Sequence, residues 1–105
     1  MKIKKNLDKL AVVIPSRNRQ DYLLRSIRFW SNTNAKIYIV DGSKKSISSN
    51  KVLTFNNNIK YYHIDKTLAE RILWVSSKIE EPYVCLISDD EFHIPSALRS
   101  CIILL

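Results

Sequence analysis

The stretch YVCLISDDEF (residues 83–92) passes from a run of mostly apolar residues into three consecutive acids, Asp89, Asp90 and Glu91. The apolar part is rich in β-forming residues and too short for an ordinary helix, which predicts a buried strand over residues 83–88. It is apolar at odd and even positions alike, as expected for a central strand of a parallel sheet that is covered on both faces. The acids therefore follow the carboxyl end of a predicted strand.

Similar short segments rich in Val, Ile and Tyr occur earlier in the chain: LAVVIP (10–15), KIYIV (36–40) and IKYYHI (59–64). We expect each to form a strand. Helical patterns alternate with them, over residues 18–30, 47–55 and 67–79 and again from Pro95 onward. This alternation predicts an α/β fold, a Rossmann-like layered sheet of mostly parallel strands flanked by helices. In such sheets ligands bind outside the carboxyl ends of the strands.

Two of the helical patterns carry specific signals. In the helix predicted over residues 18–30, Asn18 is expected to cap the amino end, and the buried stripe is expected at Leu23, Ile27 and Trp30. In the helix predicted over residues 67–79, Thr67 and Glu70 have capping-box spacing, and the buried stripe is expected at Leu68, Ile72, Val75 and Ile79.

The charge of the chain limits its partners. The net charge is +7, and residues 1–51 contain twelve Lys and Arg against three acids, whereas residues 52–105 contain five against seven. A basic half suits a polyanionic partner, either nucleic acid, anionic lipid or a phosphate-bearing small molecule. Gly42 is the only glycine, which excludes the glycine-rich loops that wrap phosphate with backbone. A phosphate ligand must therefore be met by cationic side chains, helix N-termini or a divalent metal.

The two ends of the chain and its cysteines indicate where in the cell the protein lies and whether the domain is whole. No apolar run approaches the ~20 residues that span a bilayer, and residues 1–15 make a poor signal peptide. We therefore expect a cytoplasmic chain, with peripheral attachment at the inner face of the membrane left open. Residues 102–105 (IILL) would form an apolar patch if exposed, so we expect an oligomer partner or, as we favour, a missing carboxyl-terminal half to cover them. Cys85 and Cys101 lack metal or redox spacing and are expected to be buried thiols.

The acids themselves suggest a metal site. Three adjacent carboxylates repel one another, and a bound Mg²⁺ or Mn²⁺ relieves this repulsion because hard cations prefer carboxylate and phosphate oxygens. In an extended chain Asp89 and Glu91 point to the same side while Asp90 points away. For an isolated group of acids, a solvated turn without function would be the simpler interpretation. His63 is expected to be a structural or surface residue. His93, two residues after Glu91, could reach a metal, but a polar residue in the turn before Pro95 is the favoured interpretation.

Three motifs occur in order along the chain: AVVIPSRNR (11–19), IYIVDGS (37–43) and YVCLISDDEFHIPSAL (83–98). Together they resemble the donor-binding half of family 2 glycosyltransferases of the GT-A fold. In that family a first strand ends in Pro-Thr/Ser-x-Asn-Arg, a second ends in an Asp before Gly-Ser, and a later strand ends in a DxD motif. The resemblance covers residues 10–105, and it implies that residues 1–105 are a single partial domain, the front half of a typical family member.

The resemblance implies a pocket for a nucleotide-diphospho-sugar, usually a UDP-sugar. Pro15, Ser16 and Arg17 would line the nucleotide pocket at the end of the first strand. Asp41 would hydrogen-bond the base, and Arg71 would lie near the nucleotide.

The resemblance also implies the metal ligands. Asp89 would contact the ribose or the Mg²⁺ or Mn²⁺ ion, and Glu91 occupies the ligand position that an Asp usually holds. A register that begins at Ser88 would make Asp90 the ligand instead. The catalytic base of the family comes from later in the chain, and no residue of this sequence matches it.

We therefore expect a glycosyltransferase, or the donor-binding half of one, that transfers a sugar to a polysaccharide, glycan or lipid-linked acceptor. One alternative is a nucleotide-binding remnant without turnover. A less favoured alternative is a basic nucleic-acid-binding domain, whose affinity would depend steeply on salt.

Overall fold

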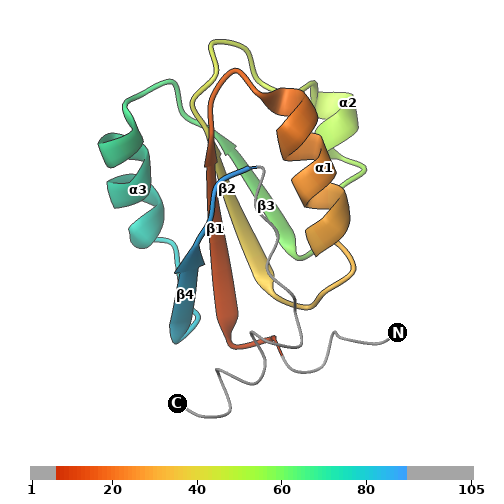
Figure 1. Cartoon of the computed structure of the whole chain (residues 1–105), viewed down its shortest axis with the longest axis vertical. Coiled ribbons are helices and arrows are strands. Elements are labelled where there is room, and N and C mark those ends of the chain that lie inside the picture. The colour runs from red at the N-terminus through yellow and green to blue at the C-terminus, as the bar shows by residue number, and fades with distance from the viewer. Residues whose placement is uncertain (1–6, 90–105) are drawn as a thin grey trace.

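A computed structural model describes residues 7–89 of the chain (Figure 1). Strands and helices alternate along this part in the order β1 (Leu10–Ser16), α1 (Gln20–Trp30), β2 (Lys36–Asp41), α2 (Ser49–Val52), β3 (Ile59–His63), α3 (Leu68–Ser76) and β4 (Tyr83–Leu86). Each strand lies where the sequence predicts one, with ends that differ by at most two residues. The helix predicted over residues 47–55 is shorter than expected, since α2 has four residues.

The strands form one sheet in the order β3-β2-β1-β4, and every pairing is parallel. The predicted Rossmann-like α/β class is therefore confirmed. From β1 the chain winds outward through β2 to β3 and then returns to place β4 on the other side of β1. Winding thus reverses between β1 and β4, which is where ligands bind in sheets of this type.

Helices cover both faces of the sheet (Figure 1). On one face α1 packs into a cluster with every second residue of β1, through Leu23, Ile27 and Trp30, all of which are buried as predicted. Helix α2 adds the partly buried Val52 to the same cluster. On the other face α3 packs over β1 and β2, chiefly through Val75. Because both faces are covered, β1 is apolar at consecutive positions, as a buried parallel strand should be.

The predicted central position of the last strand is wrong within the described sheet. Strand β4 pairs with β1 alone, and Val84 and Leu86 are 55% and 60% exposed. These two residues lie opposite Ala11 and Val13, on the face that α3 covers over β1 and β2. An apolar run indicates that a strand prefers burial on both faces, but it does not indicate where the strand lies in the sheet.

Two predictions about helix positions are also wrong. Helix α1 is capped at Arg19 rather than Asn18, because the Asn18 backbone has a φ of 57° and turns the chain before the helix begins. On α3 the capping box of Thr67 and Glu70 is confirmed, but Leu68 is 54% exposed and is not part of the buried stripe.

Two sequence expectations fall partly or wholly outside the described residues. Cys85 is half-buried and forms no disulfide among the described residues, whereas Cys101 and the helix expected after Pro95 lie beyond residue 89. Among residues 7–89, no helix is long and apolar enough to cross a bilayer.

Candidate functional site at the carboxyl edge of the sheet

Ser16 lies at the centre of the carboxyl edge, between two buried acids. Asp41 is its partner in the register of β1 and β2, and the Ser16 hydroxyl donates a 2.8 Å hydrogen bond to Asp89 Oδ2 on the β4 side. The carboxylates are 0% and 3% exposed, respectively. The ends of β1, β2 and β4, which carry the three sequence motifs, therefore meet at one residue.

Asp89 is held from several directions. Its backbone carbonyl accepts a 2.6 Å hydrogen bond from the Ser26 hydroxyl of α1. Its Oδ1 lies 3.4 Å from Arg19 Nη1, a longer contact than the one Oδ2 makes with Ser16. The carboxylate is thus oriented by a buried hydroxyl and paired with a half-exposed guanidinium.

Asp41 has a full set of hydrogen-bond donors. Oδ1 accepts from the backbone N–H and the hydroxyl of Ser43, at 3.0 and 2.6 Å. Oδ2 accepts from the Tyr61 hydroxyl at 2.7 Å and from Gln20 Nε2 at 3.1 Å. Burial alone would raise the pKa of Asp41, but the bonds from Ser43, Tyr61 and Gln20 outweigh it and hold the pKa below its ordinary value.

These four donors occupy the acceptor sites that an ionised carboxylate offers. A contact between Asp41 and a nucleotide base would therefore have to replace one of these four bonds. The predicted role of Asp41 in base recognition stays a prediction.

Arg71 links the strand ends from the α3 side. Its Nη1 donates to the carbonyls of Ser16 and Val40, at 2.9 and 2.8 Å, and its Nε donates to the Lys66 carbonyl at 3.2 Å. The side chain is 4% exposed, and burial, with Arg17 nearby, lowers the pKa of its guanidinium. Arg71 thus lies at the predicted edge, where its contacts are with the protein backbone.

Gly42 permits this arrangement. A Cβ at this position would lie 2.6 Å from both Nε and Cζ of Arg71. The φ of Gly42 is not positive, so the close approach of the guanidinium, and not the backbone conformation, explains the glycine.

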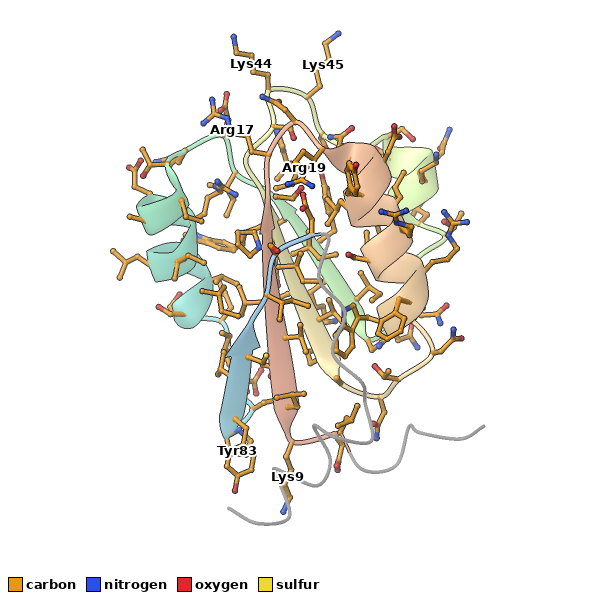
Figure 2. The ribbon with its side chains drawn as sticks, in the orientation of Figure 1. Lys9, Arg17, Arg19, Lys44, Lys45 and Tyr83 are labelled. Atoms are coloured by element: carbon orange, nitrogen blue, oxygen red, sulfur yellow. The ribbon has the colours of Figure 1, made fainter. Side chains whose placement is uncertain are left out.

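The other predicted residues are less completely placed. Pro15 is half-buried within β1, and Arg17 is exposed just beyond the strand, at the same end of the molecule as Arg19 (Figure 2). His63 is exposed at the end of β3, and its Nε2 lies 2.6 Å from the Ser43 carbonyl oxygen, in keeping with the expected structural or surface position. Asp90, Glu91 and His93 lie outside the described residues.

A protein-family model described as Glycosyl transferase family 2 matches residues 11–104, nearly the whole chain. The chain belongs to glycosyl transferase family 2. The resemblance drawn from the three motifs is thereby confirmed. Comparisons with curated proteins and with solved structures found no match.

The described part of this family 2 domain contains one of the three predicted acids. Within residues 7–89, no three His, Cys, Asp or Glu side chains gather into a metal-binding group. Asp89 has the oxygen chemistry that Mg²⁺ and Mn²⁺ prefer, and the contact of its Oδ1 with Arg19 is the looser of its two. Its surroundings are therefore compatible with a metal ligand, while the remaining ligands stay a prediction.

Several polar residues of this family 2 domain were not anticipated from the sequence: Gln20, Ser26, Ser43 and Tyr61. Ser43 could have been predicted as a partner of Asp41, because an Asp side chain commonly accepts a hydrogen bond from the backbone N–H two residues later. The other three approach the edge from α1 and β3, and only the three-dimensional arrangement of the elements brings them to the acids.

Proposed function

We propose that this glycosyl transferase family 2 chain binds a nucleotide-diphospho-sugar, preferably a UDP-sugar, at the carboxyl edge around Ser16. It would serve as the donor-binding part of an enzyme that transfers the sugar to a glycan, polysaccharide or lipid-linked acceptor. The observation that carries the proposal is the meeting of Asp41 and Asp89 on either side of Ser16, at the point where the winding of the sheet reverses.

The buried polar network gives this edge a fixed shape. Arg71 ties the backbone of β1 to that of β2, and Asp41 ties β2 to the loop that follows it. A ligand that binds such an edge loses little affinity to ordering of the protein. Arg17, exposed beyond Ser16, would meet the negative charge of the diphosphate.

Asp89 and Glu91, or Asp90 in the alternative register, would hold Mg²⁺ or Mn²⁺. A bound divalent cation supplies Lewis-acid stabilisation of the charge that grows on the departing diphosphate. For Asp89 to serve as a ligand, Oδ1 must exchange the Arg19 contact for the metal, while the Ser16 hydrogen bond to Oδ2 keeps the carboxylate oriented.

Sugar transfer breaks the bond between the anomeric carbon and the β-phosphate oxygen, and the nucleoside diphosphate leaves with the electron pair. The acceptor oxygen forms the new bond and gives its proton to a general base. Asp41 is unsuited to be this base, since it is buried and its acceptor sites are filled. We assign the base to a residue outside the described part.

Thermal unfolding with and without UDP and Mn²⁺ tests the proposal. Ligand at 100 times its Kd stabilises a folded protein by about 2.7 kcal/mol, which raises the Tm of a domain of this size by roughly 10 °C or more. We expect this rise in the native chain and its loss in Asp89→Asn. A native chain whose Tm does not move at millimolar UDP and Mn²⁺ would contradict the proposal.

Asp65→Asn is the matched control. Asp65 is exposed and lies at the start of the loop between β3 and α3, away from Ser16 along the edge. Its substitution removes the same single charge, so the Tm rise should be retained. Equal loss in both variants would attribute the effect to net charge and not to the site.

A further inference from the structure

Charge is divided unevenly between the two faces of the sheet. Residues 19–60, which include α1 and α2, contain eight Lys and Arg against two acids, Asp21 and Asp41, a net charge of +6. Residues 61–89, which include α3 and β4, contain three Lys and Arg against five acids, a net charge of −2. Helices α1 and α2 cover one face and α3 covers the other (Figure 1). The face under α1 and α2 is therefore the basic one.

A cavity of about 470 Å³ lies on this basic face, between α1 and the segment around α2. Its apolar lining includes Leu24 and Phe55, both half-buried. Arg28 and Lys51 are exposed at the same cavity, and none of the acids among the described residues lines it. The side chains that bond Asp41 and Asp89 do not line it either, so it is separate from the donor edge.

Leu53 adds an exposed apolar side chain beside the cavity. It follows α2 directly, lies between the lining residues Lys51 and Phe55 in the chain, and is 83% exposed. Its backbone N–H donates a 3.1 Å hydrogen bond to the Ser49 carbonyl, which fixes its place at the end of the helix. We call Leu24, Arg28, Lys51, Leu53 and Phe55 the α1–α2 surface.

The α1–α2 surface offers two kinds of group to a partner. Within residues 7–89, no carboxylate forms an ion pair with Arg28 or Lys51. A bilayer that contains anionic lipid matches both kinds, because its headgroups carry negative charge and hydrocarbon lies directly beneath them. The sugar–phosphate backbone of a nucleic acid matches the cations but offers no apolar group to Leu53.

From this combination we infer that the α1–α2 surface attaches the chain to an anionic membrane. Arg28 and Lys51 contact the lipid headgroups, and Leu53 inserts between them toward the hydrocarbon. Helix α1 is capped by Arg19, which contacts Asp89 at 3.4 Å, so attachment through α1 holds the donor edge close to the bilayer. This position favours the lipid-linked class of acceptor, a step that rests on the proposed function.

Co-sedimentation of the full 105-residue chain with lipid vesicles tests the inference. Binding to vesicles of equal parts phosphatidylcholine and phosphatidylserine should be at least about tenfold tighter than binding to pure phosphatidylcholine. Arg28→Gln/Lys51→Gln should weaken binding to the anionic vesicles at least about tenfold. Leu53→Ser should weaken it about fivefold or more, because the inserted apolar side chain is lost. Equal binding of the native chain to both kinds of vesicle would overturn the inference.

Two matched controls lie on the α3 side of the sheet. Lys66→Gln/Lys78→Gln removes the same charge from exposed positions, and Leu73→Ser replaces a leucine that is 75% exposed. Both controls should bind anionic vesicles as the native chain does. If each control loses as much affinity as its counterpart, binding follows net charge or general hydrophobicity, and the inference is overturned.

Two further outcomes would also overturn the inference. Vesicle binding that Leu53→Ser leaves unchanged would show attraction to any polyanion, without insertion. Tighter binding to double-stranded DNA than to the anionic vesicles at the same salt concentration would assign the surface to a nucleic acid. None of these measurements needs UDP or Mn²⁺, so their failure is distinct from a failure of the donor site.

Discussion

At the scale of single residues, Asp41 is the most completely bonded side chain of the edge. It joins β2 to the loop after it through Ser43, to α1 through Gln20 and to β3 through Tyr61. Burial and the proximity of Asp41 in turn raise the pKa of Tyr61, so the phenol stays protonated and remains a donor. The shape of the edge therefore depends on a carboxylate that stays ionised.

This dependence predicts an effect of pH on Asp41→Asn. The pKa of Asp41 is below its ordinary value in the folded chain, so its contribution is complete above about pH 4 and is lost as the pH falls through the folded-state pKa. At pH 7 the variant should lose about 1–3 kcal/mol of unfolding free energy, because Asn turns a donor toward other donors. Urea unfolding at pH 7, 5, 4 and 3 should show the difference from the native chain shrinking below pH 4. A difference that stays constant over this range would argue against an ionised Asp41.

A second prediction at this scale concerns Gly42. In Gly42→Ala the new Cβ must displace the Arg71 guanidinium, which then loses its hydrogen bonds to the carbonyls of Ser16 and Val40. We expect a loss of about 1–3 kcal/mol in unfolding free energy. The Arg71→Ala background supplies the control, because Gly42→Ala should then cost little. Additive losses in the double-mutant cycle would mean that the two residues do not interact.

At the scale of elements, local signals in the sequence were reliable when their partners were close along the chain. Thr67 and Glu70 form the predicted capping box because both groups lie within one turn. Asn18 does not cap α1, because its N–H donates a hydrogen bond to Ser43, 25 residues away, and the chain turns at Asn18. No short-range rule could anticipate that bond.

The capping box gives a prediction for α3. Thr67→Ala removes the side-chain acceptor for the Glu70 N–H and should cost about 1 kcal/mol of unfolding free energy. Ser76→Ala, at the other end of the same helix, removes an exposed hydroxyl that bonds only the Leu73 carbonyl and should cost much less. Equal losses for the two variants in denaturant titrations would show that the cap has no special part in α3.

At the scale of the whole molecule, the alternation of short apolar runs with helical patterns was sufficient to predict a parallel α/β sheet. It was not sufficient to order the strands, since β4 has the composition of a central strand but has only β1 as a neighbour in the described sheet. The motif residues Ser16, Asp41 and Asp89 could be selected from the sequence because parallel strands end at a common edge. Their supporting donors, Gln20 and Tyr61, could not, because their contacts arise from packing between elements far apart in the chain.

The structure also shows where the basic residues of the first half of the sequence lie. The basic half of the sequence includes Arg17, Arg19, Lys44 and Lys45, which lie together at the carboxyl edge (Figure 2). Lys9 lies at the opposite end. An excess of positive charge beside two buried acids suits a ligand that carries phosphate and binds a cation, and is less suited to a continuous nucleic-acid backbone.

Paramagnetic broadening by Mn²⁺ in the presence of UDP is the sharpest test of the proposed donor site, because it locates the metal on the folded chain while the nucleotide is bound. We expect selective broadening of the backbone amides of Ser16, Arg17 and Asp89, and its disappearance in Asp89→Asn. Broadening centred on another part of the surface, or the same broadening with and without Asp89, would contradict a donor site at the carboxyl edge.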